Sequence, residues 1–186
     1  EYFVRPVSEI PDNPNFANLQ DITFHFWTPI FVRSQWYRHS VGIVRNEVSR
    51  RYVDDTPTLY LPAVWRSRPE NGMKQGSSPT PVTLLHGPDY EHGGVSYQKV
   101  LNPHIAIRDL YTKILDLYEI MIQNEVAPEQ ARMILPQSMY TEFYETASVA
   151  TYARICKLRL DPHAQQEIRE YAQLVSDAVG QRFPNT

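Results

Sequence analysis

The chain has 186 residues, of which 42% are hydrophobic and 21% are charged, a mixture typical of one globular domain and not of a disordered chain. Eighteen basic residues against 21 acidic ones leave a net charge of −3, which argues against non-specific nucleic-acid binding. One cysteine excludes a disulfide framework and a multi-cysteine zinc site, and no apolar run reaches the roughly eighteen residues that span a membrane.

These properties lead us to expect no nucleic-acid partner and no membrane partner. No signal-peptide pattern opens the chain and its first residue is Glu1, so we expect a processed or trimmed cytoplasmic protein. Arginine outnumbers lysine 14 to 4. Because a guanidinium binds phosphate and carboxylate in a bidentate manner, this excess favours anionic ligands or ion-paired interfaces; the compositional bias of a GC-rich genome explains it equally well.

The N-terminal half contains short elements separated by glycine and proline. Alternating apolar and polar side chains predict a strand over 19–27, and Thr28 followed by Pro29 is typical of the N-cap and first position of a helix over 30–39. The other segments are predicted as an irregular start over 1–18, a glycine-containing loop over 40–45, an extended segment over 46–52, an edge strand over 59–64 and a long loop over 66–96.

The interval from 102 to 179 has no glycine, which favours helices. Asn102-Pro103 is expected to open a helix over 104–124. This helix has apolar residues on more than one side, so we expect it to be covered in an oligomer. Further helices are predicted over 128–134, over 138–157 and from Asp161-Pro162 onward, the last with Ile168, Tyr171, Ala172, Val175 and Val179 facing inward. Together the elements predict a single α+β domain over 1–186, with a small mixed or antiparallel sheet and a helical C-terminal half.

The first of three arginine-bearing segments places Gln35, Arg38 and His39 at i, i+3 and i+4, on one face of the predicted helix. An amide, a guanidinium and an imidazole on one face can hold a polar heterocycle or a phosphate. The alternative is a solvated helix face.

In the second segment, Glu47, Ser49 and Arg51 point the same way if the backbone is extended, and they can bind a sugar phosphate; a surface strand with alternating charges is the alternative. In the third, Asp161 is expected to cap the last helix and His163 to lie in its first turn. A helix N-terminus attracts anions, and Arg159 adds a charge beside it.

Little other chemistry is visible in the chain. No glycine-rich phosphate loop and no paired Cys/His metal spacing occur. Asp89, Glu91 and His92 could form a metal loop, but a polar turn is the plainer interpretation and we predict no metal site. Cys156 lies in an apolar stretch and is expected to be a small core residue.

The three segments, in this order, resemble the flavin-dependent thymidylate synthases. The family motif RHRxxSxNExSxRY corresponds to residues 38–52 (RHSVGIVRNEVSRRY), in which NExSxRY is intact. Upstream, TFHFWTPIFVRSQWYRH resembles the strand and helix that precede the family motif, and residues 131–173 resemble the family's C-terminal helices. The resemblance extends over about 16–183.

The resemblance implies an enzyme that binds FAD and methylates C5 of dUMP with methylene-tetrahydrofolate and NADPH, as a homotetramer. It implies that Arg159 is catalytic and also binds the nucleotide. The other nucleotide-binding residues would be Gln35, Glu47, Ser49, Arg50, Arg51 and Arg132, and the residues against the flavin would be Arg38, His39, Arg45, Arg154 and His163.

The chain also departs from the family pattern. The spacing from Arg-His to Asn-Glu is one residue longer, the third motif residue is Ser40 or Val41 instead of arginine, and Ser148 and Ala150 replace an asparagine and an arginine. We therefore expect the 40–45 loop to be mobile without ligand and the chain to bind FAD more weakly than is usual for the family, unless Arg45 replaces the missing guanidinium. A UMP methylase of nucleoside-antibiotic biosynthesis, a non-catalytic nucleotide-binding paralogue and a structural helical module remain alternatives.

Overall fold

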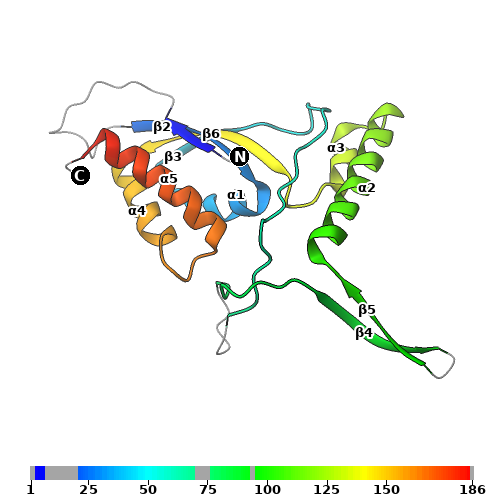
Figure 1. Ribbon diagram of the computed structural model, residues 1–186. Coiled ribbons are helices and arrows are strands. Elements are labelled where there is room, and N and C mark those ends of the chain that lie inside the picture. Colours follow the sequence, from blue (N-terminus) through cyan, green and yellow to red (C-terminus); the bar gives the residue numbers. More distant parts are fainter. Residues whose placement is uncertain (1–2, 7–20, 70–75, 93–94, 185–186) are drawn as a thin grey trace. The chain divides into compact units, whose positions relative to one another are not determined.

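A computed structural model describes residues 3–6, 21–69, 76–92 and 95–184 (Figure 1). The chain forms two compact units, the first built from Glu1–Ser49 with Gln137–Thr186 and the second from Arg50–Pro136. Each unit is described separately below.

The first unit contains a four-stranded antiparallel sheet in the order β1-β2-β6-β3. Its strands are β1 (Phe3–Pro6), β2 (Asp21–Pro29), β6 (Tyr140–Ser148) and β3 (Ile43–Glu47). β6 lies in the centre, where it pairs Glu145 with Phe24 on one side and with Arg45 on the other. This register brings a residue from near the C-terminus between two segments from near the N-terminus.

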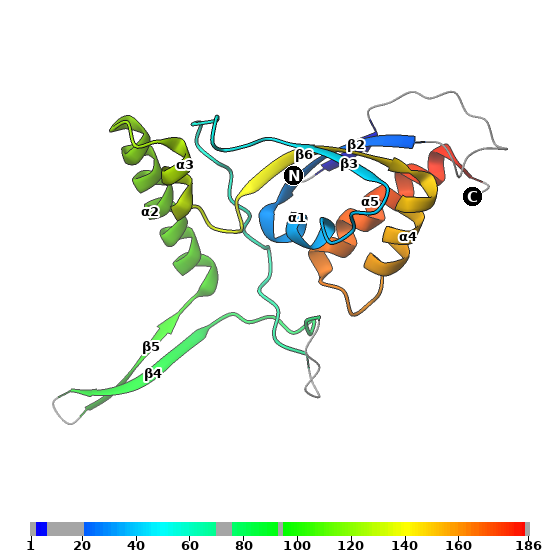
Figure 2. The same ribbon diagram turned by 180° about the vertical axis from the view of Figure 1, so that it is seen from behind.

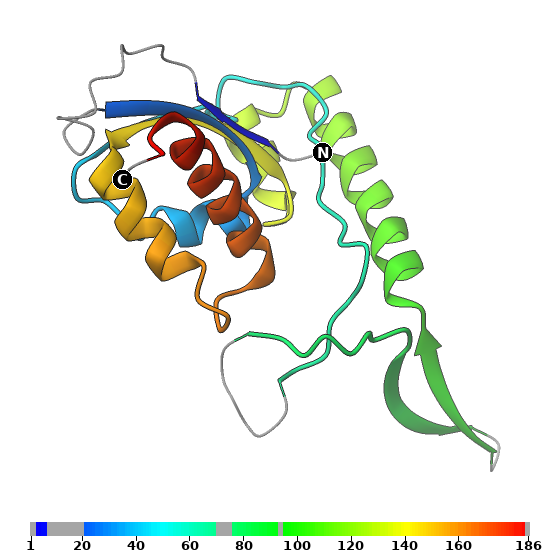
Figure 3. The same cartoon turned by 60° about the vertical axis from the view of Figure 1, so that its left-hand side comes forward.

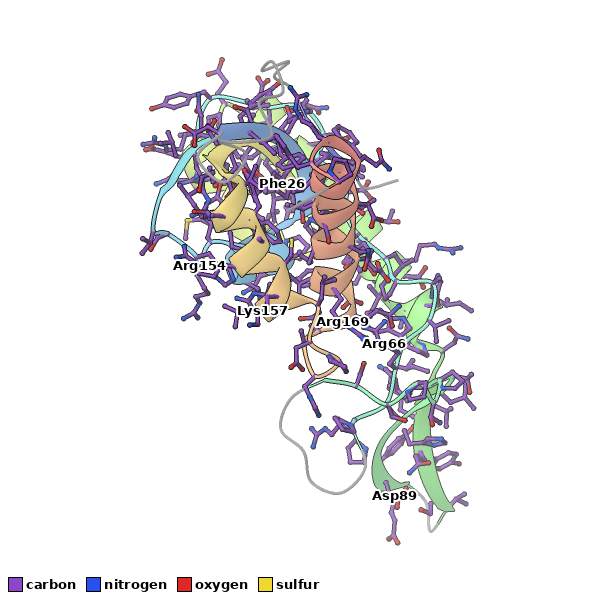
Figure 4. All side chains as sticks on the ribbon, turned by 90° about the vertical axis from the view of Figure 1, so that its left-hand side faces the viewer. Phe26, Arg66, Asp89, Arg154, Lys157 and Arg169 are labelled. Atoms are coloured by element: carbon purple, nitrogen blue, oxygen red, sulfur yellow. The ribbon has the colours of Figure 1, made fainter. Side chains whose placement is uncertain are left out.

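Three helices pack against one face of this sheet, as Figures 1 and 3 show: α1 (Ile30–Trp36), α4 (Val149–Arg159) and α5 (Gln166–Arg182). Phe26 points from β2 toward these helices (Figure 4) and is stacked on Phe143 with ring centroids 4.6 Å apart. The core is rich in aromatic side chains because alternate residues of β2 and β6 face the helices. Its largest fully buried members are Trp36, Tyr152, Tyr171, Phe24, Phe26 and Phe143.

The opposite face of the sheet also carries aromatic side chains. Trp27 is stacked on Tyr140 and His25 on Tyr144, with centroid distances of 3.9 and 4.5 Å. His25 also lies 3.2 Å from the Glu142 carboxylate. This face therefore has its own cross-strand pairs, separate from those of the core.

The second unit contains a hairpin of β4 (Leu85–His92) and β5 (Val95–Leu101), followed by α2 (Pro103–Gln123), α3 (Pro128–Ala131) and the short 3₁₀ helix Arg132–Ile134 (Figure 2). The Asn102 side chain accepts hydrogen bonds from the backbone amides of His104 and Ile105, so it caps α2 as the sequence indicates. In the described part of the chain, no helix combines the length and the apolar character needed to cross a lipid bilayer.

The predicted α+β class is confirmed, and so are the helices beginning at Pro103 and Pro128 and the buried position of Cys156. The predicted helix over 138–157 is wrong in its first half, because residues 140–148 form β6. This segment (YTEFYETAS) is rich in β-branched and aromatic residues and alternates between the two faces of the sheet. The low glycine content of the region obscured that alternation.

Other predicted boundaries are also corrected. The helix over 30–39 ends at Trp36, and the last helix begins at Gln166 and not at Asp161-Pro162. Segment 59–64 forms no strand. The predicted loops over 40–45 and 66–96 contain the start of β3 and the hairpin strand β4, and the irregular start contains β1; residues 7–20 lie outside the described part.

Candidate functional site

The end of α1, the start of β3 and the end of α4 bring His39 against Arg159. The Nε of Arg159 donates to the Nε2 of His39 at 2.8 Å, and another guanidinium nitrogen of Arg159 donates to the backbone carbonyl of Gln35 at 2.7 Å. The Gln35 carbonyl lies in the last turn of α1, where helix carbonyls lack intrahelical partners. Arg159 therefore caps α1 and orients the His39 ring at the same time.

The His39 imidazole is neutral in this arrangement. Its Nε2 accepts a hydrogen bond, which assigns the ring proton to Nδ1. Burial lowers the pKa of His39, and the charges of Arg159, Arg45 and Arg154 lower it further. An uncharged ring leaves the positive charge of this corner on the arginines.

Arginines surround His39 on several sides. Burial lowers the pKa of Arg159, and the charge of Arg38 lowers it further. Arg154 extends from α4 (Figure 4) and donates to the backbone carbonyl of Val41 at 3.2 Å. Among the described residues, no carboxylate is bonded to Arg38, Arg154 or Arg159. A cluster of guanidiniums without matching carboxylates is suited to an anionic ligand.

Gln35 is held at the same corner by a different set of contacts. Its side-chain amide donates to the Oε1 of Gln165 at 2.5 Å, and Gln165 in turn donates to the Oε2 of the buried Glu167 at 2.9 Å. The sequence places Gln35, Arg38 and His39 on one helix face. The structure keeps Gln35 in α1 and places Arg38 and His39 in the turn that follows it.

Glu47 lies at the end of β3 and is already partnered within the unit. Its Oε1 accepts from the Nε of Arg33 at 3.0 Å and from the Thr141 hydroxyl at 2.9 Å. The predicted extended run over 46–52 stops here, since β3 ends at Glu47 and residues 50–51 turn. The expected alternation of Glu47, Ser49 and Arg51 on one side is therefore wrong.

The predicted nucleotide-binding arginines Arg50, Arg51 and Arg132 belong to the second unit. Arg50 donates to the Asp55 carboxylate at 2.7 Å and to the Asp55 backbone carbonyl. The guanidinium carbon of Arg51 lies 5.0 Å from the centroid of the Tyr52 ring, and Arg132 is exposed at the start of its 3₁₀ helix. Their participation in one nucleotide site with the residues of the first unit stays a prediction.

His163 and Asp161 form a local turn before α5 and do not lie in its first turn. The Asp161 carboxylate accepts from the backbone amide of His163 at 2.8 Å and lies 2.9 Å from its Nδ1. The backbone amide of His163, and then its side chain, lower the pKa of Asp161. Both side chains are exposed, so the flavin contact expected of His163 stays a prediction.

The sequence reasoning missed Glu145, which is fully buried on the core face of β6. Its Oε1 accepts from the indole N–H of Trp36 at 2.9 Å, and its Oε2 accepts from the Nε of Arg45 at 2.5 Å. Arg45 also donates to the His39 carbonyl at 2.5 Å and lies over the Tyr37 ring, 4.4 Å from its centroid. The alternation of Phe143, Glu145 and Ala147 was the available signal, and the helix assignment concealed it.

The residues considered as a possible metal loop lie on the hairpin of the second unit, with Asp89 (Figure 4) and Glu91 on β4; the side chain of His92 and residues 93–94 lie outside the described part. Over the described residues, no group of three metal-binding side chains occurs.

The first unit is defined by an antiparallel sheet, three helices on one face and a cationic corner suited to an anionic ligand.

Comparison with known proteins places the chain in a family. Residues 15–185 match the family described as thymidylate synthase complementing protein, and the chain belongs to that family. It is 34% identical over 161 residues to a flavin-dependent thymidylate synthase of Thermus thermophilus, covering 87% of this chain and 53% of the relative. For the enzyme of the same description from Aquifex aeolicus, the identity is 37% over 161 residues, covering 86% and 45%. The chain thus spans about half the length of these relatives.

Proposed function

We propose that this chain takes part in flavin-dependent methylation of C5 of a pyrimidine nucleotide, converting dUMP to dTMP with methylene-tetrahydrofolate and NADPH. The family membership supports this reaction class. The single observation that carries the proposal is the corner of Arg38, His39, Arg154 and Arg159. Its guanidiniums have no carboxylate partner among the described residues and surround a neutral imidazole.

The donor set of this corner fits a flavin dinucleotide. A pyrophosphate needs cationic N–H donors, and an uncharged imidazole can stack on a planar heterocycle. We propose that Arg38, His39, Arg154 and His163 hold FAD. Arg45, which the resemblance also places against the flavin, is bonded to Glu145 and to the His39 carbonyl within the unit. The nucleotide would be bound by Gln35, Glu47, Ser49, Arg50, Arg51, Arg132 and Arg159.

In this proposal the bound flavin supplies the hydride chemistry, and the protein supplies binding, orientation and electrostatics. Arg159 donates toward the pyrimidine and stabilises negative charge that develops on the ring. Because His39 and the Gln35 carbonyl both hold the Arg159 guanidinium, little reorientation is needed when the substrate binds. Cys156 takes no part, since burial raises the pKa of its thiol to about 12.

A second candidate is methylation of the ribonucleotide UMP. The segment between His39 and Glu47, which is one residue longer than in the family motif, keeps this candidate open. A non-catalytic nucleotide-binding relative would keep the phosphate-binding arginines and lack flavin.

The visible spectrum of the purified protein, recorded with and without added FAD, tests the proposal. A flavin absorption band that stays with the protein through gel filtration supports it. A colourless protein that takes up no added FAD contradicts it and leaves the non-catalytic alternative. Assays with dUMP and with UMP, each with NADPH and methylene-tetrahydrofolate, then separate the two methylation candidates by which nucleotide gains a methyl group.

A further inference from the structure

Glu145 is an unusual residue for the position that it occupies. It lies on β6 between Phe143 and Ala147, on the face that packs against α1, α4 and α5, and it is 0% exposed. An isolated carboxylate at such a site is strongly disfavoured, and burial raises its pKa. The indole N–H of Trp36 and the guanidinium of Arg45 offset this cost, one at each carboxylate oxygen.

Arg45 connects this buried carboxylate to the turn that carries His39. Its Nε is bonded to Glu145, while another nitrogen of the same guanidinium donates to the His39 carbonyl. Since the guanidinium is planar and rigid, the two bonds place the His39 backbone at a defined distance from β6. The Tyr37 ring, 4.4 Å from the guanidinium carbon, restricts the same group from one side.

The other contacts of this turn depend on the position of His39. The His39 ring accepts from Arg159, and Arg154 holds the Val41 carbonyl two residues further on. Both arginines come from α4, whereas Arg45 and Glu145 come from β3 and β6. The turn is therefore fixed between a helix and the sheet interior.

We infer that Arg45 and Glu145 form a positioning pair that fixes the 37–42 turn between α1 and β3 from inside the unit, and so sets the geometry of His39 and Arg159 for the anionic ligand. Arg45 acts through the His39 backbone and not by contact with the ligand. This inference rests on the proposed function for the identity of the ligand, whereas its structural part concerns the chain alone.

The test uses two variants and one control in the full chain. Arg45→Met with Glu145→Leu replaces the buried pair by apolar side chains of similar length, an exchange that proteins often tolerate without loss of stability. Glu145→Gln keeps the charge of Arg45 but removes its ionic partner. The control is Glu142→Gln, the same exchange on the same strand, on the face opposite the core, where the carboxylate contacts His25.

The ligand-free measurements are backbone hydrogen exchange of residues 37–45 and the NMR signals of the His39 imidazole. We expect the double variant to unfold at a temperature near that of the wild type, to exchange these amides at least about tenfold faster and to lose the single Nδ1–H tautomer of His39. Glu142→Gln should leave the unfolding temperature, the amide exchange rates and the His39 tautomer unchanged. Wild-type exchange and an unchanged His39 tautomer in a folded double variant would overturn the inference.

Titration with FAD, followed by flavin fluorescence, separates positioning from direct contact. If Arg45 acts through His39, then Glu145→Gln and the double variant both lose about tenfold or more in affinity. If Arg45 binds the ligand itself, Glu145→Gln retains or gains affinity, and the inference is wrong. If the wild type binds no FAD, the proposed function fails, and the ligand-free measurements still decide whether the pair positions the turn.

Discussion

The Nε of Arg159 lies 2.8 Å from the Nε2 of His39, although both side chains can carry a positive charge. Their hydrogen bond requires an unprotonated Nε2, so protonation of the ring would replace an attraction by a repulsion. Burial and three neighbouring arginines lower the pKa of His39 in the folded chain. The pH dependence of this corner follows from that shift.

We predict that His39 makes the free energy of unfolding depend on pH just below neutrality. The folded pKa lies below the ordinary value of 6.5, so between these two values the unfolded chain binds more protons than the folded chain. The stabilisation is therefore complete above pH 6.5 and is lost as the pH falls toward the folded pKa. Urea unfolding of the wild type and of His39→Gln at several pH values measures this. A difference between the two proteins that does not vary with pH would contradict it.

Arg159 is predicted to contribute to nucleotide binding. Arg159→Ala should weaken the binding of dUMP or UMP by about 1.5–3 kcal/mol, the range for a charge-assisted hydrogen bond, and Arg51→Ala should do the same. Calorimetric titration measures the affinity. Lys157→Ala is the matched control for Arg159, because it removes an exposed cation from the same last turn of α4 (Figure 4). Equal affinities for Arg159→Ala and the control would reject the role.

Among the elements, the turn between α1 and β3 lies where the chain is one residue longer than the family motif. Gly42 adopts a φ of +72° there, in the left-handed region that other residues rarely enter. The Val41 carbonyl is bonded to Arg154, and β3 begins at Ile43, so the segment has a defined backbone path. Its predicted mobility without ligand stays a prediction.

Two glycine substitutions should therefore change stability in opposite directions. Gly42→Ala should cost about 1–2 kcal/mol, because alanine is strained in the left-handed region. A Cβ at Gly42 would lie 3.4 Å from the Thr151 hydroxyl, an ordinary contact, so the backbone conformation is the main cause. Gly180→Ala lies within α5, where an added Cβ meets nothing within 4 Å, and should stabilise by about 0.5–1 kcal/mol. Thermal unfolding of both variants measures this, and a destabilising effect of the same size in each would argue against the strained turn.

At the scale of the whole molecule, α2 has more apolar surface than a solvated helix needs. Tyr118 is fully buried, but Leu117 and Ile120 are about half exposed, as are Ile105 and Leu110. Exposed apolar side chains along one long helix are typical of a surface that another protein covers. We propose that a second copy of this chain covers it and that the assembly is a homotetramer.

Light scattering at micromolar concentration should accordingly report a mass well above the 21.6 kDa of one chain. Leu117→Glu with Ile120→Glu should shift the mass toward the monomer, because it places charges in the apolar surface. Lys113→Glu changes an exposed charge on the same helix and should leave the mass unchanged. A wild-type mass of one chain would reject the oligomer.

The sequence alone indicated the α+β class, the strand that became β2 and the helix that begins at Pro103. It also indicated the family, through the motif at 38–52 together with the segments that resemble the family before and after it. These features depend on local signals: alternation, an asparagine cap before proline, and a motif contiguous along the chain. The His39 and Arg159 segments were both identified in this way, as separate candidates.

The tertiary structure decided which of these candidates meet. Residues 140–148 pair with β2 on one side and with β3 on the other. Their local propensity favours a strand, but it does not specify partners more than ninety residues away. Once β6 is a strand, Glu145 faces Arg45 inside the core, and His39 receives a bond from each side, one from Arg45 and one from Arg159. The sequence shows which residue types are present and in what order. Which of these residues contact one another depends on the sheet register, and long-range packing alone determines that register.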